Sequence, residues 1–462
     1  MKKIISTLCV LSVIATSCNK TLEVRILYSL SASQTSISLA DNQTTTQTII
    51  VTTDANSWDA TTDAIWLTIK KEDNILTITP VANPETTERT ATVTITAATA
   101  PPVTVTVIQA GRSFEQFGNN LTASSVYGGG TGKEDDPYLI YTAQQLKKFV
   151  YDVNSGKSYA DTYFKLMTHI HVTADEWVPI GNGTNAYFNG NFNGNNHIIS
   201  GTLKSSDYRF FGFFGVLGSG SVSFTISNLI IEANIINESN FSTDNFVDSY
   251  TGAICGFSGY AANSYVVISD CVITGTVTGG NSGSSSTGGV AGSNNTRIQN
   301  CVVSGHVNGG KCLGDFGAYT GGITGIHSGE IDNCEVLSSA SVTGGDTDYF
   351  SHTGGIAGMS NGMITNCTNR AAVTGRHTVG GIVAQNGFVM GGEVHTSLNT
   401  GDVSGGNNST GGLIGVNNNT ATTHIYSCST NLGKVNGDSA KESNQVGIGK
   451  GVEACPDEHT KR

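Results

Sequence analysis

The sequence has few charged residues, few prolines and no long apolar segment beyond its N-terminus. Charged residues make up 13% of 462 residues, and 7 prolines stand against 58 glycines. The net charge is -12 and no cluster of Lys and Arg occurs, which argues against nucleic acid as a partner because phosphate binding needs concentrated positive charge. After the first apolar run, no window holds the roughly 18 apolar residues of a membrane-spanning helix. The abundant Gly, Thr, Ser and Asn are typical of short strands joined by tight turns.

The N-terminus has the layout of a secretory signal. Two lysines precede an apolar run at residues 4–14, which is too short to span a bilayer. Residues 15–18 (ATSC) resemble the lipobox of bacterial lipoproteins, with Ala15 where Leu is usual. That resemblance implies that Cys18 carries the lipid anchor. We therefore expect residues 1–18 to be a lipoprotein signal peptide and the chain to be an outer-membrane lipoprotein exposed at the cell surface. A simply cleaved signal is the alternative, and periplasmic orientation stays open.

Residues 19–111 alternate β-branched and polar residues. A period of two indicates strands with one buried face. Turn signals such as Asp41-Asn42 and Asp73-Asn74 separate six or seven such segments, as in an antiparallel sandwich. We expect Trp66 to lie in the core, because it sits on an alternating strand, and Trp58 to be either core or an exposed surface for stacking against sugars.

The first domain also resembles a known family. "AIWLTI" at residues 64–69, "ITPVANPETTERTATVTI" at residues 78–95 and "VTVIQAG" at residues 105–111 resemble the BACON domain. The resemblance implies an immunoglobulin-like sandwich of the kind found in Bacteroidota surface proteins, which were proposed to bind carbohydrate. A role as a spacer is the alternative.

A second domain begins after a segment at residues 112–130 that is rich in Ser, Asn and Gly and is expected to be a linker. In "YTAQQLKKFVYDV", Thr142 and Gln145 form a capping box, and apolar residues recur on one helical face. A β-helix needs such a plug, because the open end of its core exposes apolar side chains and unpaired strands. We expect the β-helix to span residues 131–455, followed by a tail at residues 456–462.

From Gly212 onward the sequence repeats itself seven times. Five of the six intervals between repeats are 30 to 33 residues, each with three predicted β segments and glycine turns. A period of that size predicts a solenoid whose coils bury their apolar faces only by stacking. One aligned column of the repeats contains Leu229, Cys271, Cys301, Cys334, Cys367, Ser397 and Cys428.

Each recurring residue type has an expected role in the coils. Double glycines such as Gly288-Gly289 supply positive φ or close approach of neighbouring coils. The asparagine before the cysteine column lies at a corner, where it tolerates left-handed geometry and can hydrogen-bond up the stack. The cysteines are expected to be buried and mostly free, because stacked Cβ atoms lie about 4.8 Å apart, wider than a disulfide needs. The disulfide state of Cys255, Cys312 and Cys455 stays open.

The repeat pattern, a double glycine followed by an apolar residue and later by I-x-N-(C/S), resembles the GLUG motif. The segment "DDPYLIYTAQQL" and the later "FNGNFNGNNHIISG" resemble the region that precedes those repeats. The resemblance implies a right-handed parallel β-helix of the kind found in bacterial adhesins and surface proteins. The predicted fold is therefore all-β: an immunoglobulin-like β-sandwich followed by a right-handed parallel β-helix with a short N-terminal capping helix.

The sequence contains no recognisable catalytic set. Parallel β-helices also include polysaccharide lyases and glycosidases, which need paired carboxylates or calcium-binding carboxylates beside a base. The candidate acids and bases are scattered: Asp315, Asp332, Glu335, Asp346, Asp348, Arg297, Lys311 and Arg376. His169 and His171 are only two ligands, so we expect a surface pair on a strand and no metal. No cofactor is expected. A polysaccharide lyase or glycoside hydrolase is the third hypothesis for the function.

Insertions before the double-glycine turn in three coils provide the candidate binding surface. Stacking would bring these insertions to one flank, and the coil between them, which ends in the serine-rich residues 280–286, would leave a dip. Aromatic rings beside acids and amides are typical of sugar sites. The candidate residues are Phe246, Tyr250, Asp315, Phe316, Tyr319, Asp346, Asp348, Tyr349 and Phe350.

We therefore predict a noncatalytic surface lipoprotein that attaches to glycans or a host surface polymer. The alternative is a structural spacer or a component of envelope assembly. The sequence identifies no ligand and no oligomeric state.

Overall fold

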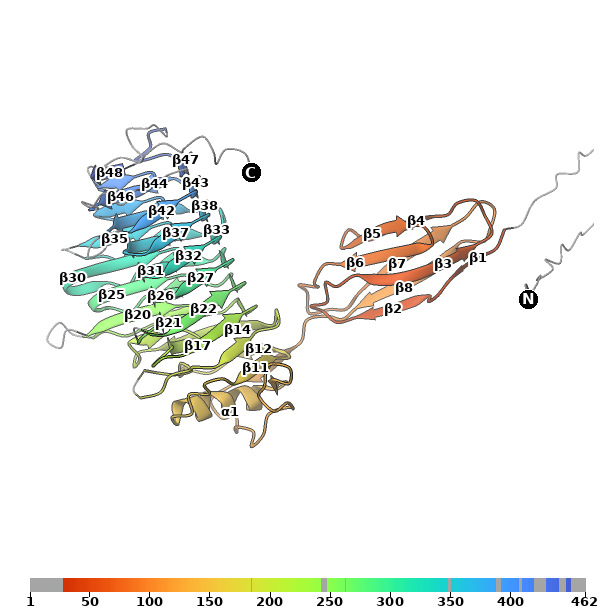
Figure 1. The fold of residues 1–462 in the computed structure, drawn as a ribbon, viewed down its shortest axis with the longest axis horizontal. Helices are drawn as coiled ribbons and strands as arrows, with labels where there is room; N and C mark the ends of the chain where they lie inside the picture. The colour runs from red at the N-terminus through yellow and green to blue at the C-terminus, as the bar shows by residue number, and fades with distance from the viewer. Residues whose placement is uncertain are drawn as a thin grey trace, which may run out of the picture. The chain divides into compact units, whose positions relative to one another are not determined.

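The computed structural model describes residues 28–183, 185–241, 247–261, 263–347, 350–387, 392–406, 409–418, 429–439 and 446–449. The chain divides into two compact units, Met1–Arg112 and Ser113–Arg462, both drawn in Figure 1. The predicted lipid attachment site, Cys18, lies outside the described residues. In the described part of the chain, no helix combines the length and the apolar character needed to cross a bilayer.

The first unit is a β-sandwich of two four-stranded sheets. One sheet contains β1 (Leu30–Ala32), β3 (Gln47–Thr53), β6 (Ile75–Pro80) and β5 (Leu67–Glu72). The other contains β2 (Ser36–Leu39), β8 (Val103–Gln109), β7 (Arg89–Thr96) and β4 (Asp59–Thr62). The alternating pattern predicted the sandwich correctly, and the structure has eight strands in place of the expected six or seven.

Of the two tryptophans of the sandwich, Trp58 takes one of its two predicted positions and Trp66 differs from its prediction. Trp58 is buried in the core, and its Nε1 donates a hydrogen bond to the backbone oxygen of Asp73 (2.9 Å). Trp66, predicted as core, is only half-buried, and the guanidinium of Arg89 lies 4.3 Å from the centre of its ring. The indole of Trp58 is therefore not an exposed stacking surface, and Trp66 lies at the edge of the core because it directly precedes β5.

The second unit is a solenoid built of four long sheets, whose strand pairings are all parallel among the described strands. Sheet I contains β10 (Tyr138–Ile140), β11 (Tyr163–Leu166), β13 (Asn191–Asn193), β17 (Ser223–Ser227), β22 (Tyr265–Ser269), β27 (Arg297–Gln299), β32 (Glu330–Asp332), β37 (Met363–Thr365) and β42 (Glu393–His395). Sheet II has two arms that meet at β14 (Ile198–Ser205). One arm contains β9 (Phe114–Phe117), β12 (His169–Val172), β18 (Ile230–Ile231), β23 (Val272–Ile273), β28 (Val302–Val303), β33 (Glu335–Val336), β38 (Thr368–Asn369), β43 (Leu398–Asn399) and β47 (Thr430–Asn431). The other arm contains β19 (Asn234–Asn237), β24 (Val277–Thr278), β29 (His306–Asn308), β34 (Ser341–Thr343), β39 (Ala372–Thr374) and β44 (Val403–Ser404).

Sheets III and IV complete the solenoid. Sheet III contains β15 (Phe210–Phe211), β20 (Asp248–Gly252), β25 (Ser282–Gly288), β30 (Cys312–Gly321), β35 (Ser351–Gly354), β40 (Thr378–Gly380) and β45 (Thr410–Gly411). Sheet IV contains β16 (Phe214–Leu217), β21 (Cys255–Ser258), β26 (Ala291–Asn294), β31 (Thr324–His327), β36 (Ala357–Ser360), β41 (Val383–Asn386), β46 (Ile414–Asn417) and β48 (Val446–Gly449). A complete coil, such as β20 to β24, therefore has five short strands where three were predicted. Two of the predicted β segments are each divided by a bend, between β20 and β21 and between β22 and β23.

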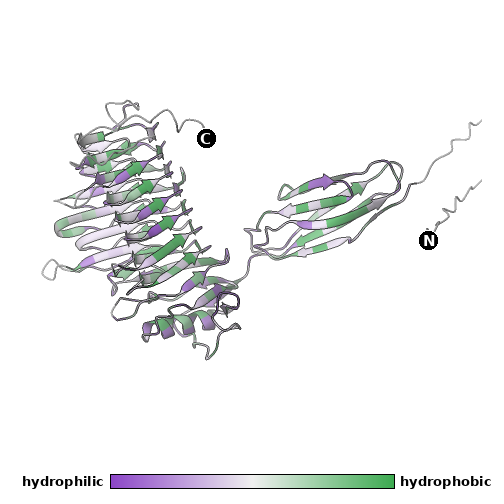
Figure 2. Ribbon diagram, in the orientation of Figure 1, coloured by the Kyte–Doolittle hydropathy of each residue, from purple (hydrophilic) through white to green (hydrophobic). Residues whose placement is uncertain are grey.

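Helix α1 (Ala143–Asn154) closes the N-terminal end of the stack, as predicted. The backbone N–H of Gln145 donates to the Thr142 hydroxyl (3.3 Å), which confirms the N-cap half of the predicted capping box. The side-chain oxygen of Gln145 accepts from the backbone N–H of Tyr141 (2.7 Å) and not from that of Thr142. Leu146, Phe149, Val150 and Val153 are buried, and Figure 2 shows the resulting stripes of hydrophobic and hydrophilic residues along the helix. The ring of Phe149 packs against Phe164, Phe188 and Phe192 of the first coils.

A buried carboxylate ties α1 to the segments beside it. Asp152 is 4% exposed and accepts hydrogen bonds from the ammonium groups of Lys148 (2.8 Å) and Lys157 (3.1 Å). The hydroxyls of Tyr159 (2.6 Å) and Tyr127 (3.3 Å) also donate to it. Burial by itself raises the pKa of Asp152, but the hydrogen bonds from Lys148, Tyr159 and Lys157 outweigh it and lower this pKa to about 2.

The segment predicted as a linker is largely part of the solenoid. Strand β9 pairs with β12, and the Phe117 ring lies 5.2 Å from the ring of Trp177 in the core. Leu121 and Tyr127 also pack against this core. The linker prediction was wrong here. It followed the polar composition of residues 112–130 and overlooked the few apolar residues among them, which pack against the core.

The asparagine column at the corner is confirmed. Asn228, Asp270, Asn300, Asn333 and Asn366 have positive φ between 50° and 56°. The Asn333 amide donates to Asn300 (2.9 Å), and the Asn300 amide donates to Asp270 (3.0 Å). The double glycines take the second of their two predicted roles, since neither Gly288 nor Gly289 has positive φ, and a Cβ on Gly289 would overlap the carbonyl oxygen of Gly322 in the next coil.

The cysteine column is buried, as predicted. Cys271, Cys301, Cys334 and Cys367 are free, and each thiol lies within hydrogen-bonding distance of the carbonyl oxygen two residues earlier. Cys255 and Cys312 are also buried and free. Cys455 lies outside the described residues.

The last member of this column differs from the prediction. The backbone N–H of Ser397 donates to the Ser429 hydroxyl (3.0 Å), and Leu398 pairs with Thr430. The strand register therefore places Ser429 at the position that the sequence alignment gave to Cys428, which itself lies outside the described residues.

His169 and His327 are buried in the solenoid. The first was predicted at the surface, and no prediction was made for the second. His169, expected at the surface, is 3% exposed, and its Nδ1 accepts a hydrogen bond from the backbone of Ile198 (2.9 Å). His327 lies in a polar column inside sheet IV, between Asn294 and Ser360 of the neighbouring coils. Its Nδ1 lies 3.4 Å from the Asn294 amide, and its Nε2 lies 3.3 Å from the carbonyl oxygen of Met363. Burial lowers the pKa of His327 to about 4.

Candidate functional site

Sheets III and IV come into close contact along a glycine-lined corner. A Cβ on Gly256 of β21 would overlap the backbone of Phe210 in β15, and a Cβ on Gly292 of β26 would overlap the backbone of Tyr250 and Thr251 in β20. Only glycine permits this approach, because any larger residue would push the two sheets apart. The outward side chains of the two sheets are thereby brought together.

Five aromatic rings gather at this corner, and we call them the aromatic corner: Tyr187, Phe210, Tyr250, Phe257 and Tyr260. Phe210 and Tyr250 are stacked, with ring centres 5.4 Å apart. The Phe257 ring lies edge-on to Tyr250 (5.3 Å) and to Tyr260 (5.5 Å). Tyr260 in turn stacks with Tyr187 (5.8 Å). The five rings form one continuous cluster contributed by segments far apart in the sequence, in which Phe210 is buried against three of the other rings.

The aromatic corner is not part of the solenoid core. None of its rings belongs to the cluster of apolar residues inside the coils. Tyr260 is 49% exposed, and Tyr187, Tyr250 and Phe257 are half-buried. Aromatic rings with one face in solvent and a hydroxyl at the edge are suited to stack against the CH faces of sugars.

Charged groups border the rings. The guanidinium of Arg209 lies 4.7 Å from the centre of the Phe210 ring and 3.9 Å from the carboxylate of Asp248. The Tyr250 hydroxyl donates to that carboxylate (3.1 Å). Burial and the neighbouring carboxylate of Asp248 raise the pKa of Tyr250, so this hydroxyl stays protonated, keeps its hydrogen bond to Asp248 and can accept a hydrogen bond from a ligand hydroxyl. Hydrogen-bonding groups for ligand hydroxyls thus lie beside the stacking faces.

A second ring stack lies further along the same column of sheet III, toward the C-terminal coils. Strand register aligns Phe210, Tyr250, Ser286, Tyr319 and His352. The rings of Tyr319 and His352 are stacked, with centres 5.2 Å apart. Ser286 separates the two stacks, so the backbones of Tyr250 and Tyr319 are two strand spacings apart, about 9.6 Å. The small side chain of Ser286 occupies the position of the predicted dip.

The structure places the other predicted residues as follows. Phe316 and Phe350 are exposed, and the Tyr319 hydroxyl donates to the backbone oxygen of Phe316 (3.2 Å). The carboxylate of Asp346 pairs with Arg376 (3.1 Å) at the surface. Asp315 lies in β30, but its side chain is outside the described structure. Residues 246, 348 and 349, which include the predicted Asp348 and Tyr349, are outside the described residues.

The carboxylates considered for catalysis have partners in the structure. Asp332 accepts hydrogen bonds from the Thr365 hydroxyl and the Asn366 amide (both 2.9 Å), and Glu335 pairs with Arg370 (2.5 Å). Across the described part of the chain, no group of three His, Cys, Asp or Glu side chains is arranged to hold a metal ion.

Four rings of the aromatic corner were missed by the sequence reasoning: Tyr187, Phe210, Phe257 and Tyr260. The alignment of the first repeat began at Gly212, two residues after Phe210, and so omitted the strand that pairs with β20. Extending each repeat upstream of the double glycine would have aligned Phe210 with Tyr250. Tyr187 precedes the repeats, and nothing in the sequence connects it with Tyr260.

Comparisons with known proteins cover only parts of the chain. Residues 29–112 match the family described as Viral BACON domain, which supports the predicted BACON-like character of the first unit. A protein of Evansella cellulosilytica named "Putative Gly-rich membrane protein" is 33% identical over 120 residues, which are 24% of this chain and 13% of that protein. This chain therefore spans a small part of that relative's length. The solved structure "Bacteroides ovatus GH5 xyloglucanase in complex with a XXXG heptasaccharide" is 16% identical, with a TM-score of 0.17, over 30% of this chain and 37% of that one, a likeness too low to bear on fold or function.

Proposed function

We propose that this protein is a noncatalytic surface lipoprotein that binds glycans through the aromatic corner of its β-helix. The observation that carries the proposal is a continuous set of five rings outside the core, with Tyr260 49% exposed. Rings that serve only to pack the core are buried inside the coils. Rings with a face in solvent can instead stack against a sugar ring. The BACON domain at residues 29–112 supports a carbohydrate-binding role for the chain as a whole.

The lipoprotein part of the proposal rests on the sequence. The lipobox-like residues 15–18 and the apolar run before them support attachment through acyl chains on Cys18. The repeats, which resemble the GLUG motif, support placement among bacterial surface proteins. Together these features favour a chain that is anchored by lipid and presents the solenoid to glycans outside the cell.

The direct test is a glycan array of mucin-type and plant glycans probed with the full-length protein. Retained glycans are then titrated against Tyr250→Ala/Tyr260→Ala. We expect Kd to rise roughly 30-fold, since two central aromatic contacts are worth about 2 kcal/mol or more. Tyr250→Phe keeps the ring and should bind within about threefold of wild type, because a hydrogen bond contributes less than the stacking face.

Tyr151→Ala is the matched control, because Tyr151 is a tyrosine on α1 that is 67% exposed and lies outside the aromatic corner. Its affinity should equal that of wild type. Unchanged binding by the double variant would refute the aromatic corner as the site. An array with no retained glycan would favour a structural spacer, and release of new reducing ends from a retained polysaccharide would favour an enzyme.

A further inference from the structure

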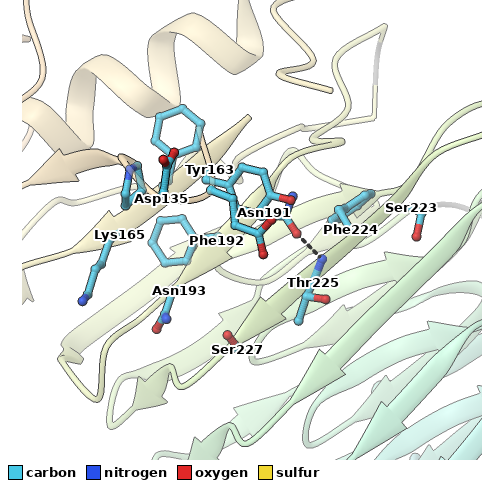
Figure 3. Close-up of a pocket in the computed structure, with 13 residues that line it drawn as sticks. Asp135, Tyr163, Lys165, Asn191, Phe192, Asn193, Ser223, Phe224, Thr225 and Ser227 are labelled. Atoms are coloured by element: carbon cyan, nitrogen blue, oxygen red, sulfur yellow. Dashed lines mark hydrogen bonds between the residues drawn. The ribbon is translucent and has the colours of Figure 1, made fainter. Parts of the chain in front are cut away.

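A separate pocket lies on the outward face of sheet I. It has a volume of about 660 Å³ and is bordered by strands β11, β13 and β17 and by the loop at residues 134–137. Figure 3 shows its side chains, with Lys165, Asn191 and Asn193 on the strands and Asp135 on the loop. Its volume is within the range of small-molecule sites, about 300–1,000 Å³. None of its lining residues belongs to the aromatic corner.

The pocket walls follow from the coil register. Tyr163, Asn191 and Thr225 form one outward column, and Lys165, Asn193 and Ser227 form the next. Members of a column lie about 4.8 Å apart, so neighbouring coils present a two-by-three grid of polar side chains. The side chains between the two columns, Phe164 and Phe192, are buried and form the floor.

The hydrogen-bond donors of this grid are unused. The amide oxygen of Asn191 accepts from the backbone of Thr225 (2.9 Å), and that of Asn193 accepts from the backbone of Asn195 (2.7 Å). These bonds fix both amide groups, and neither amide nitrogen has an acceptor among the described residues. The ammonium group of Lys165 likewise forms no ion pair within the described structure. Three donors are therefore free, and the two amide donors among them are also held in a fixed orientation.

The same two columns behave differently in later coils. Arg297 pairs with Glu330 (3.4 Å) and lies 3.7 Å from Asp332. The Thr365 hydroxyl donates to Asp332 (2.9 Å). There the polar side chains satisfy one another, as expected of a solvated sheet face, whereas the pocket keeps its polar groups available. This contrast points to a ligand.

From these groups we infer that the pocket binds a neutral saccharide of more than one hexose. Lys165, Asn191 and Asn193 supply donors, while Glu134 and Asp135 on the loop supply acceptors, and vicinal hydroxyls of a sugar need both at once. Two carboxylates against one ammonium give the site a net negative charge, which disfavours uronates and other anions. The inference extends the proposed glycan binding to a second face of the solenoid, and rests on it only for the ligand class.

The test uses the full-length protein with cellotriose, mannotriose and trigalacturonate, titrated separately. The variant Lys165→Met/Asn193→Asp removes donors but keeps the oxygen that accepts from Asn195. We expect a neutral trisaccharide to bind wild type and to lose about tenfold or more in affinity to this variant. Gln299→Ala, in the same column of a later coil, should bind like wild type.

Comparison with the corner variant separates the two sites. Tyr250→Ala/Tyr260→Ala should retain the binding that Lys165→Met/Asn193→Asp loses. Wild-type affinity in the pocket variant, or a preference for trigalacturonate over both neutral sugars, would overturn the pocket while leaving the aromatic corner untouched. Failure of both neutral sugars to bind wild type would also overturn it.

Discussion

Replacing Asp152 with alanine should lower the free energy of unfolding of the solenoid by about 3–5 kcal/mol, the usual effect of removing one partner from a buried ion pair. Asp152 is 4% exposed and accepts four hydrogen bonds, from Lys148, Lys157, Tyr127 and Tyr159. The variant leaves the Lys148 ammonium, whose side chain is only 17% exposed, without its counter-ion. Because α1 covers the end of the apolar core, detachment of α1 would expose the first coils to solvent.

Trp177 allows this loss to be measured in the solenoid alone. Trp177 is buried there and stacks on Phe213 (5.6 Å), whereas the other two tryptophans are in the sandwich. In a Trp58→Phe/Trp66→Phe background, urea unfolding followed by fluorescence reports the solenoid. Lys157→Ala is the control, because the Lys157 side chain is 60% exposed and its surface ion pair is worth at most about 1 kcal/mol. Equal midpoints for Asp152→Ala and Lys157→Ala would contradict the account.

The solenoid should also lose stability steeply in mild acid. Burial lowers the pKa of His327 to about 4, and burial with the nearby His377 lowers the pKa of His352 to about 4. In the unfolded chain a histidine has a pKa of about 6.5. As the pH falls below about 6.5, the unfolded state therefore binds protons first. The free energy of unfolding keeps its full value above that pH, decreases as the pH falls from about 6.5 to about 4, and levels off below 4.

Each histidine contributes a slope approaching 1.4 kcal/mol per pH unit in this window, or about 3 kcal/mol by pH 4. Neither site accommodates a proton readily, since the Nδ1 of His352 has no hydrogen-bond partner among the described residues. Urea unfolding at intervals between pH 7 and pH 4, with Trp177 as reporter, measures the slope.

His327→Asn separates this effect from general acid unfolding. Asparagine already occupies the same column at Asn294 and Asn386, so the substitution should keep the coil intact. It should remove about half of the acid sensitivity that the two histidines produce. A variant with the slope of wild type would show that the charge on His327 is not responsible.

The repeating parts of the solenoid were predictable because one coil constrains the next. An asparagine precedes Cys301, Cys334 and Cys367 in successive repeats, and its positive φ and amide ladder follow from stacking of equivalent positions. The buried thiols followed from the same alignment. The predicted alignment was wrong only at the last coil, where the column contains Ser429 and not the preceding residue, Cys428.

Features that depend on contacts between unlike segments were not predictable. The aromatic corner forms because the glycine at residue 256 lets sheet IV approach sheet III, and no periodicity relates Phe210 to Phe257. His169 is buried because β9, from the segment interpreted as a linker, pairs with β12 and places Phe114 5.4 Å from its ring. Composition alone could not reveal that strand.

Hydrogen–deuterium exchange of the full-length protein, with and without the glycan retained on the array, tests most directly whether the β-helix binds sugar at the aromatic corner. We expect slower exchange on binding in peptides covering β15, β20 and β21, which provide Phe210, Tyr250 and Phe257. Protection confined to residues 29–112 would instead assign glycan binding to the BACON domain and contradict the account.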